Sequence, residues 1–222
     1  MEHRDFKDRL YTQFARVGQA LASPKRLELL DLLAQAPRHV EALAEEMELS
    51  LASVSQHIQV LRRAELVEAS RDGTRVVYRL AGKQVLQLYL ALRAVAEGRL
   101  AEVDRINRGA RPEEEPHVTR ESVLQQLESG EVVVVDVRPP LEFEHGHLPG
   151  ALSVPLEDLP QRLGNLPKDK ELVVYCRGAY CLWADDALAI LRQKGFNVRR
   201  LEGGWEEWWD EERPVQNGAH AT

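Results

Sequence analysis

One stretch decides the fold of the N-terminal half: residues 53–80 are SVSQHIQVLRRAELVEASRDGTRVVYRL. Its first apolar residues recur at spacings of three and four, which predicts a helix over about 51–64 that buries Val54, Ile58 and Leu61. The segments LVEAS and RVVYRL then flank RDGT, whose Asp72-Gly73 pair is typical of a tight hairpin turn. The stretch therefore predicts a helix followed by a β-hairpin.

Three more helices are predicted before this stretch. Helical spacing predicts the first over about 5–21, with an apolar stripe of Phe6, Leu10, Phe14, Val17 and Leu21. A second helix, RLELLDLLA, follows the candidate N-cap Ser23 and first-turn Pro24. The third is HVEALAEEM, and a turn at 48–50 separates it from the helix at 51–64. Two short helices joined by a tight turn and followed by two strands predict an α+β winged helix-turn-helix.

The outward face of the helix at 51–64 carries side chains that suit DNA. Ser and Gln can bind base edges in the major groove, and Arg can bind phosphates. Residues 51–83 hold six basic and three acidic side chains. The alternative is a small α+β domain with solvated polar residues. The candidate DNA-binding residues are Ser53, Ser55, Gln56, Gln59 and Arg62 on the helix, with Arg71 and Arg75 at the hairpin tip.

Over about residues 10–80, ALASPKRLELLDLLA and the stretch quoted above resemble the ArsR family of winged-helix transcriptional repressors. The resemblance implies a homodimer that binds palindromic double-stranded operator DNA and pairs through its first and last helices, here about 5–21 and 82–105. We assign the apolar stripe of the last helix to dimerisation: Val85, Leu88, Leu92, Val95 and Leu100. Metal-sensing members carry Cys before the recognition helix or His on the last helix. VEALAEEMEL has no Cys and residues 82–107 have no His, so no metal site is expected.

Charge and composition divide the 222-residue chain in two. The net charge of −7 splits into +1 for residues 1–107, from 16 Lys/Arg against 15 Asp/Glu, and −8 for residues 108–222, from 13 against 21. We therefore predict an N-terminal domain at 1–107, a linker at 108–117, a second domain at 118–212 and a disordered tail at 213–222. The first residues are charged and no long apolar run occurs, which favours a soluble, cytoplasmic protein.

The C-terminal half predicts an α/β fold with a parallel sheet. The apolar runs VVVVDV at 132–137 and LVVY at 172–175 are short enough for buried strands, and residues 182–194 predict a helix that Gly195 ends. Chemistry in such sheets lies at the carboxyl ends of strands, and Cys176 directly follows one. Loop amides before a helix lower a thiol pKa, which predicts a nucleophilic Cys176 thiolate. The alternative is a buried, inert cysteine.

Three motifs in this half together resemble a rhodanese (sulfurtransferase) domain over about 117–210: DVR at 136–138 with GHLPGA at 146–151, then CRGAYC at 176–181, then LEGGWEEW at 201–208. The resemblance implies that Cys176 accepts sulfane sulfur from a small donor, such as thiosulfate or polysulfide, and forms a persulfide. It places loop residues Gly178, Ala179 and Tyr180 around the sulfur, with Arg177 attracting an anionic donor. We interpret Asp136 and Arg138 as a structural ion pair, and we expect no cofactor.

The end of the cysteine loop departs from related loops. Tyrosine phosphatases and arsenate reductases place Arg six positions after the cysteine, where this chain has Leu182. Many rhodaneses end the loop with a basic residue, and here Cys181 stands there. This substitution favours thiol redox chemistry, with Cys181 as a resolving thiol. The alternative is that Cys181 is a packed spacer.

These observations predict a DNA-binding regulator, a repressor, whose rhodanese-like domain senses or transfers sulfane sulfur through a Cys176 persulfide. One alternative is a thiosulfate-type sulfurtransferase with an accessory DNA-binding domain. Another is an arsenite or heavy-metal sensor that uses Cys176 and Cys181. The latter lacks a third thiolate within the chain, since the sequence has two cysteines.

Overall fold

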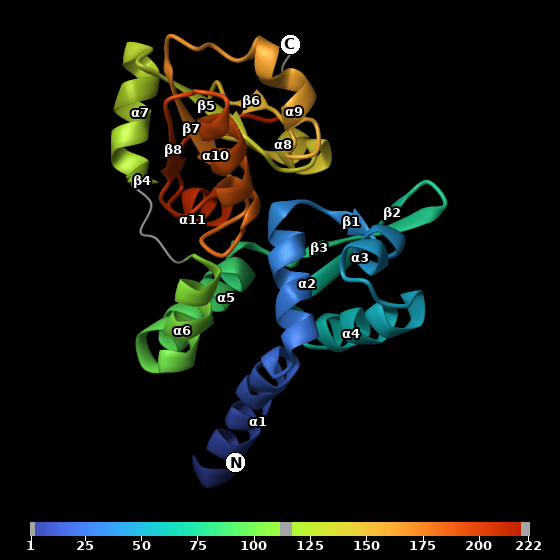
Figure 1. The fold of residues 1–222 in the computed structure, drawn as a ribbon. Coiled ribbons are helices and arrows are strands. Elements are labelled where there is room, and N and C mark those ends of the chain that lie inside the picture. The colour runs from blue at the N-terminus through green and yellow to red at the C-terminus, as the bar shows by residue number, and fades with distance from the viewer. Residues whose placement is uncertain (1–2, 112–116, 219–222) are drawn as a thin grey trace. The chain divides into compact units, whose positions relative to one another are not determined.

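The computed structural model describes residues 3–111 and 117–218 and forms two compact units, Met1–Val95 and Ala96–Thr222 (Figure 1). The division falls inside a helix, before the boundary expected at Asn107. The reason is that the next helix, α6 (Ala101–Ala110), goes with the C-terminal unit, where Arg111 pairs with Asp185. Composition gives no sign of that contact.

The first unit has the predicted order of helices and strands. Ser23 occupies the N-cap position of α2 (Pro24–Gln35) without a side-chain hydrogen bond, and Pro24 lies in the first turn. The Ser50 hydroxyl accepts a hydrogen bond from the Ser53 amide at the start of α4 (Leu51–Arg63). Its elements are α1 (His3–Leu21), α2 (Pro24–Gln35), β1 (Arg38–His39), α3 (Val40–Glu46), α4 (Leu51–Arg63), β2 (Val67–Asp72), β3 (Arg75–Leu80) and the start of α5 (Lys83–Arg99).

The wing is a three-stranded antiparallel sheet in the order β1-β3-β2. The sequence did not predict β1, whose two residues are too few to show a period. The hairpin turn was also placed one residue early. Asp72 pairs with Arg75, so the two loop residues are Gly73 and Thr74, with Gly73 at a φ of 60°. A positive φ favours glycine here, and the strands extend fully to the turn.

The single helix predicted over 82–105 is wrong. Leu100 adopts an extended conformation (φ −108°, ψ 100°) and separates α5 from α6. Gly98, two residues earlier, weakens a helix because it lacks a side chain. The apolar stripe also steps five residues from Val95 to Leu100, after steps of three and four, so the break has a local signal that we did not use.

The core of the first unit is made by α2, α3, α4 and the start of α5, as its fully buried side chains show: Leu29, Leu43, Val54, Ile58, Leu61 and Leu86. Burial of the predicted stripe on α4 is therefore confirmed. Helix α1 contributes little to this core, because its buried residues are Ala20 and Leu21 at its end.

The second unit is built on a five-stranded parallel sheet in the order β4-β8-β7-β5-β6, which confirms the predicted α/β fold. Gly195, with a φ of 80°, follows the last helical turn of α10 as expected. After α6, the elements are β4 (His117–Val118), α7 (Arg120–Ser129), β5 (Val132–Asp136), α8 (Pro140–His145), β6 (Leu152–Ser153), α9 (Leu159–Arg162), a 3₁₀ turn (Leu163–Asn165), β7 (Glu171–Tyr175), α10 (Trp183–Gln193), β8 (Val198–Leu201) and α11 (Trp205–Asp210).

Both faces of this sheet are covered. Alternate residues of β5 and β7 point to opposite faces, so Val174 packs with α10 and α9, whereas Val173 packs with α7, α8 and α11. A parallel sheet covered on both faces explains why its central strands are continuous apolar runs. The carboxyl end of β7 is followed directly by the cysteine loop.

Two predicted boundaries need correction. Residues 108–110 of the expected linker belong to α6, Arg111 follows them, and His117 begins β4; residues 112–116 lie outside the described residues. The expected disordered tail is ordered up to Gly218, because its backbone is paired: Gln216 and His147 exchange two backbone hydrogen bonds of 2.9 Å, and the Trp208 indole donates to the Pro214 carbonyl. The rest of the tail, 219–222, lies outside the described residues.

Candidate functional site: a DNA-binding helix and a cysteine loop

Helix α4 and the hairpin present the predicted DNA-binding side chains on the surface of the first unit. Gln56, Gln59 and Arg62 are exposed, and Ser53 and Ser55 are half-buried. Arg71 and Arg75 are exposed beside the turn between β2 and β3. Gln56 and Gln59 lie opposite the buried stripe of α4, and Ser53, Ser55 and Arg62 lie at its flanks.

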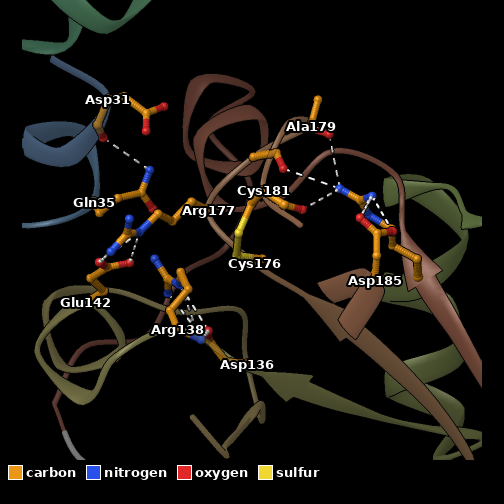
Figure 2. The surroundings of a disulfide bond; sticks show 12 residues. Asp31, Gln35, Asp136, Arg138, Glu142, Cys176, Arg177, Ala179, Cys181 and Asp185 are labelled. Carbon is orange, nitrogen blue, oxygen red and sulfur yellow. Dashed lines mark hydrogen bonds and ion pairs between the residues drawn. A yellow bond between two sulfur atoms is a disulfide. The ribbon is translucent and has the colours of Figure 1, made fainter. Parts of the chain in front are cut away.

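The second site is the loop Cys176–Cys181, between the end of β7 and the start of α10. The two cysteines form a disulfide with a Cα–Cα distance of 6.2 Å, within the range that a disulfide tolerates (Figure 2). We expected a free thiolate at Cys176. The structure instead shows the oxidised form of the pair. The chain reverses between strand and helix and brings the two residues together, which sequence spacing alone does not fix.

The loop is seated against the segment that starts α11. The Trp205 amide donates to the Cys176 carbonyl (3.0 Å), and the Glu206 amide donates to the Arg177 carbonyl (2.9 Å). A Cβ atom at Gly204 would overlap the Cys176 carbonyl oxygen and lie 2.7 Å from the Gly178 nitrogen. Glycine is therefore required in the GGW motif because two backbone segments meet there.

Arg177 has a partner that the sequence analysis missed. Its guanidinium forms a two-pronged ion pair with the buried Glu142 carboxylate, at 2.5–3.1 Å (Figure 2). The guanidinium also lies 4.5 Å from the ring centre of Trp183. Glu142 balances the charge of Arg177, so the pair as a whole attracts an anionic donor less than a lone guanidinium would. Residues 35 positions apart give no local signal of such a pair.

Asp136 and Arg138 form a fully buried ion pair below the loop. Arg138 donates to both Asp136 carboxylate oxygens, at 2.6–3.1 Å, and to the Gly146 carbonyl at 2.7 Å. Burial alone would lower the pKa of Arg138, but the Asp136 charge raises it above its usual value. Burial also raises the pKa of Tyr175, whose hydroxyl donates to Asp136. The pair ties the first central strand to neighbouring segments, which is a structural role.

Two arginines that the sequence analysis did not single out also hold the loop. Arg200 of β8 donates to the Ala179 carbonyl (3.1 Å) and pairs with Asp185 (2.8 Å), and burial lowers its pKa. Arg111 binds the same carbonyl oxygen and the same carboxylate. Arginine in a charged helix or at a strand end is common, so no pattern in the sequence marks these two.

Two findings concern other kinds of site. Within residues 3–111 and 117–218, no three His, Cys, Asp or Glu side chains gather as a metal site would need. The helices of this part of the chain are all too short or too polar to cross a membrane.

Comparison with known proteins agrees with this architecture. Residues 23–69 match the arsR family of bacterial regulatory proteins, and residues 119–211 match the rhodanese-like domain. Over 215 residues the chain is 45% identical to the HTH-type transcriptional regulator Rv0324 of Mycobacterium tuberculosis, covering 97% of this chain and 95% of that one. The chain belongs to the ArsR family of transcriptional regulators. In this regulator the DNA-binding fold is followed by a rhodanese-like domain, as both resemblances predicted.

Each part of the regulator also has relatives of its own. Over 93 residues it is 37% identical to a sulfurtransferase of Allochromatium vinosum, covering 41% of this chain and 85% of that one. A solved winged helix-turn-helix domain from Mycobacterium bovis, described as homodimeric and as a possible ArsR-family regulator, is 45% identical, with a TM-score of 0.42, and covers 45% of this chain and 91% of that one.

Proposed function

We propose that this regulator is a homodimeric repressor whose rhodanese-like domain senses sulfane sulfur through Cys176. The observation that carries the proposal is the bond between Cys176 and Cys181 in the loop after β7. Two sulfurs within bonding distance form a unit that can change between dithiol and disulfide, and the same polypeptide carries a DNA-binding helix. A chemical change at the loop can therefore be coupled to transcription.

The proposed sensing reaction has two steps. In the dithiol form, the Cys176 thiolate attacks the sulfane sulfur of a donor such as thiosulfate, which releases sulfite and leaves a persulfide on Cys176. The Cys181 thiolate then attacks the Cys176 Sγ atom, the bond to the outer sulfur breaks, and its electron pair leaves with hydrosulfide. The sulfane sulfur is thus the oxidant that produces the disulfide.

The exposed apolar side chains of the first unit support the proposed dimer. Phe6, Tyr11 and Phe14 of α1 are exposed, the last at 59%, and so are Leu92 and Val95 of α5. Exposed aromatic and aliphatic side chains along two helices are characteristic of a surface that another chain covers. Pairing of α1 and α5 with a second copy would place two α4 helices at successive half-sites of an operator.

A sulfurtransferase with an accessory DNA-binding domain is the second candidate. The similarity to the Allochromatium vinosum sulfurtransferase favours it, since it spans most of that protein. The two proposals differ in the fate of the sulfur. An enzyme passes sulfur to an acceptor repeatedly, whereas a sensor ends as a disulfide that changes DNA affinity.

Operator binding before and after polysulfide treatment tests the proposal. We expect the reduced protein and the treated protein to differ in DNA affinity, with mass spectrometry showing first an added sulfur on the Cys176 peptide and then a Cys176–Cys181 bond. Cys176→Ser should keep DNA binding and lose the response. Cys181→Ser should accumulate the persulfide and lose the response. An unchanged response in Cys176→Ser would overturn the sensing role.

A further inference from the structure

Arg111 binds the cysteine loop from outside the rhodanese-like domain. It directly follows α6 and precedes the matched residues 119–211. Its guanidinium donates to the carbonyl oxygens of Ala179 (2.7 Å) and Cys181 (3.0 Å), and it pairs with the Asp185 carboxylate (2.7 Å). It also donates to the Asn107 side chain in the last turn of α6 (3.2 Å). One side chain therefore joins α6 to the loop that carries the disulfide.

Arg200 makes a parallel set of contacts from inside the domain. It donates to the Ala179 and Cys181 carbonyl oxygens (3.1 and 3.4 Å) and pairs with Asp185, which Figure 2 shows beside the loop. Each of the two carbonyl oxygens thus accepts from two guanidinium groups, and one carboxylate joins both cations. Such charge-assisted bonds depend closely on where the carbonyl oxygens lie. Arg200 is fixed in β8, so Arg111 is the residue that connects the preceding helix.

The disulfide helps to fix those carbonyl oxygens. Cys181 supplies one of them and is itself held to Cys176 by the S–S bond. Its neighbours Tyr180 and Leu182 are 41% and 44% exposed, so at this end of the loop Cys181 is the residue that packs against the core. The Tyr180 hydroxyl also donates to Glu97 in the last turn of α5 (2.8 Å), which is a second bond from this end of the loop to the preceding helices. Opening the disulfide therefore removes one of the constraints on the part of the loop that Arg111 binds.

We propose that Arg111 is a positioning residue that binds the disulfide form of the loop more tightly than the dithiol form, so that the oxidation state of the cysteines controls how firmly α6 is held. The inference rests on the proposed function in taking this loop as the sensor. Coupling of this kind is reciprocal: if the disulfide strengthens the Arg111 contacts, Arg111 stabilises the disulfide by the same factor. Its loss should make the disulfide easier to reduce.

Redox equilibration of the full chain tests this reciprocity. Dithiothreitol supplies the electrons: one thiolate attacks a sulfur of the bridge, the second closes the reductant's own ring, and Cys176 and Cys181 gain two electrons and two protons as thiols. The thiol fraction is measured by alkylation and mass spectrometry. We expect Arg111→Met to shift the equilibrium constant toward the dithiol by at least about fivefold. Arg111→Lys, which keeps the charge and loses the planar fork, should shift it less.

Arg120→Met is the matched control. Arg120 is as exposed as Arg111, at 17%, and likewise pairs with one carboxylate, that of Glu211. It donates to one backbone carbonyl, that of Glu202, whereas Arg111 donates to two. These partners are not in the cysteine loop, so this substitution should leave the equilibrium unchanged. Equal values for wild type, Arg111→Lys and Arg111→Met, or the same shift in Arg120→Met, would overturn the proposal. Circular dichroism checks folding, and Arg111→Lys keeps the test valid where Arg111→Met fails to fold.

Hydrogen exchange in residues 101–110 gives an independent readout. Backbone amides of α6 should exchange faster after reduction of the wild-type disulfide, and equally fast under both conditions in Cys181→Ser, which has no bridge to reduce. Equal amide exchange rates in α6 of the oxidised and the reduced wild-type protein would contradict the proposal. Neither measurement uses DNA or polysulfide, so failure here is distinct from failure of the operator-binding test.

Discussion

Helices α1 and α10 are both amphipathic, yet only α10 buries its apolar face inside its own unit. Ala184, Ala187, Leu188 and Leu191 of α10 are buried against the sheet. In α1, by contrast, the aromatic residues are exposed and burial is confined to Ala20 and Leu21. The C-terminal unit therefore completes its core by itself, whereas the N-terminal unit leaves the apolar side chains of α1 exposed, which is the surface that the proposed dimer would bury.

The largest effect should come from placing a charge in the exposed apolar stripe of α1. Phe14→Asp places a carboxylate in the proposed dimer surface and removes one buried Phe per protomer, which costs about 3–6 kcal/mol per dimer. Analytical ultracentrifugation should show a monomer, with operator affinity lost as a consequence. Thr12→Asp, on the other side of α1, is the control and should remain dimeric. A dimer that survives Phe14→Asp would mean that α1 is not the pairing surface.

A smaller effect should follow from adding a methyl group in the C-terminal unit at Gly204, where the backbone packs against the cysteine loop. In Gly204→Ala the added methyl group meets the backbone of Cys176 and Gly178, and neither can move without shifting β7 or the loop. We expect a loss at the upper end of about 1–3 kcal/mol in the free energy of unfolding. Urea denaturation measures it. Gly164→Ala, where a methyl group meets nothing within 4 Å, should change stability little; equal effects at both glycines would contradict the packing argument.

The smallest effects concern the exposed polar face of the N-terminal unit. Gln56→Ala should reduce discrimination between operator and random DNA by about 1 kcal/mol, the lower end for a base-edge contact. Arg75→Ala should weaken binding to both DNAs alike and reduce the salt dependence by about one counterion. Fluorescence titrations at several salt concentrations separate the two roles. Equal losses on both DNAs from the two substitutions would remove the distinction between base and phosphate contacts.

The sequence by itself determined the elements whose signals are local. The period of α4, the presence of a hairpin in the wing, the apolar runs of β5 and β7 and the position of Cys176 after a strand all follow from residues a few positions apart. The same signals carried both family resemblances, which the comparisons confirm. Helical and strand periods are properties of neighbouring residues, so no tertiary information is needed to find them.

Only the tertiary structure decided which side chains surround the cysteines. Glu142 reaches Arg177 from 35 positions away, Arg111 reaches Cys181 from 70, and the GGW segment closes on the loop through Gly204. The ordered tail was hidden for the same reason. Each depends on backbone or charged groups whose partners lie far along the chain, and an arginine or glycine carries no local mark of the partner that it will meet after folding.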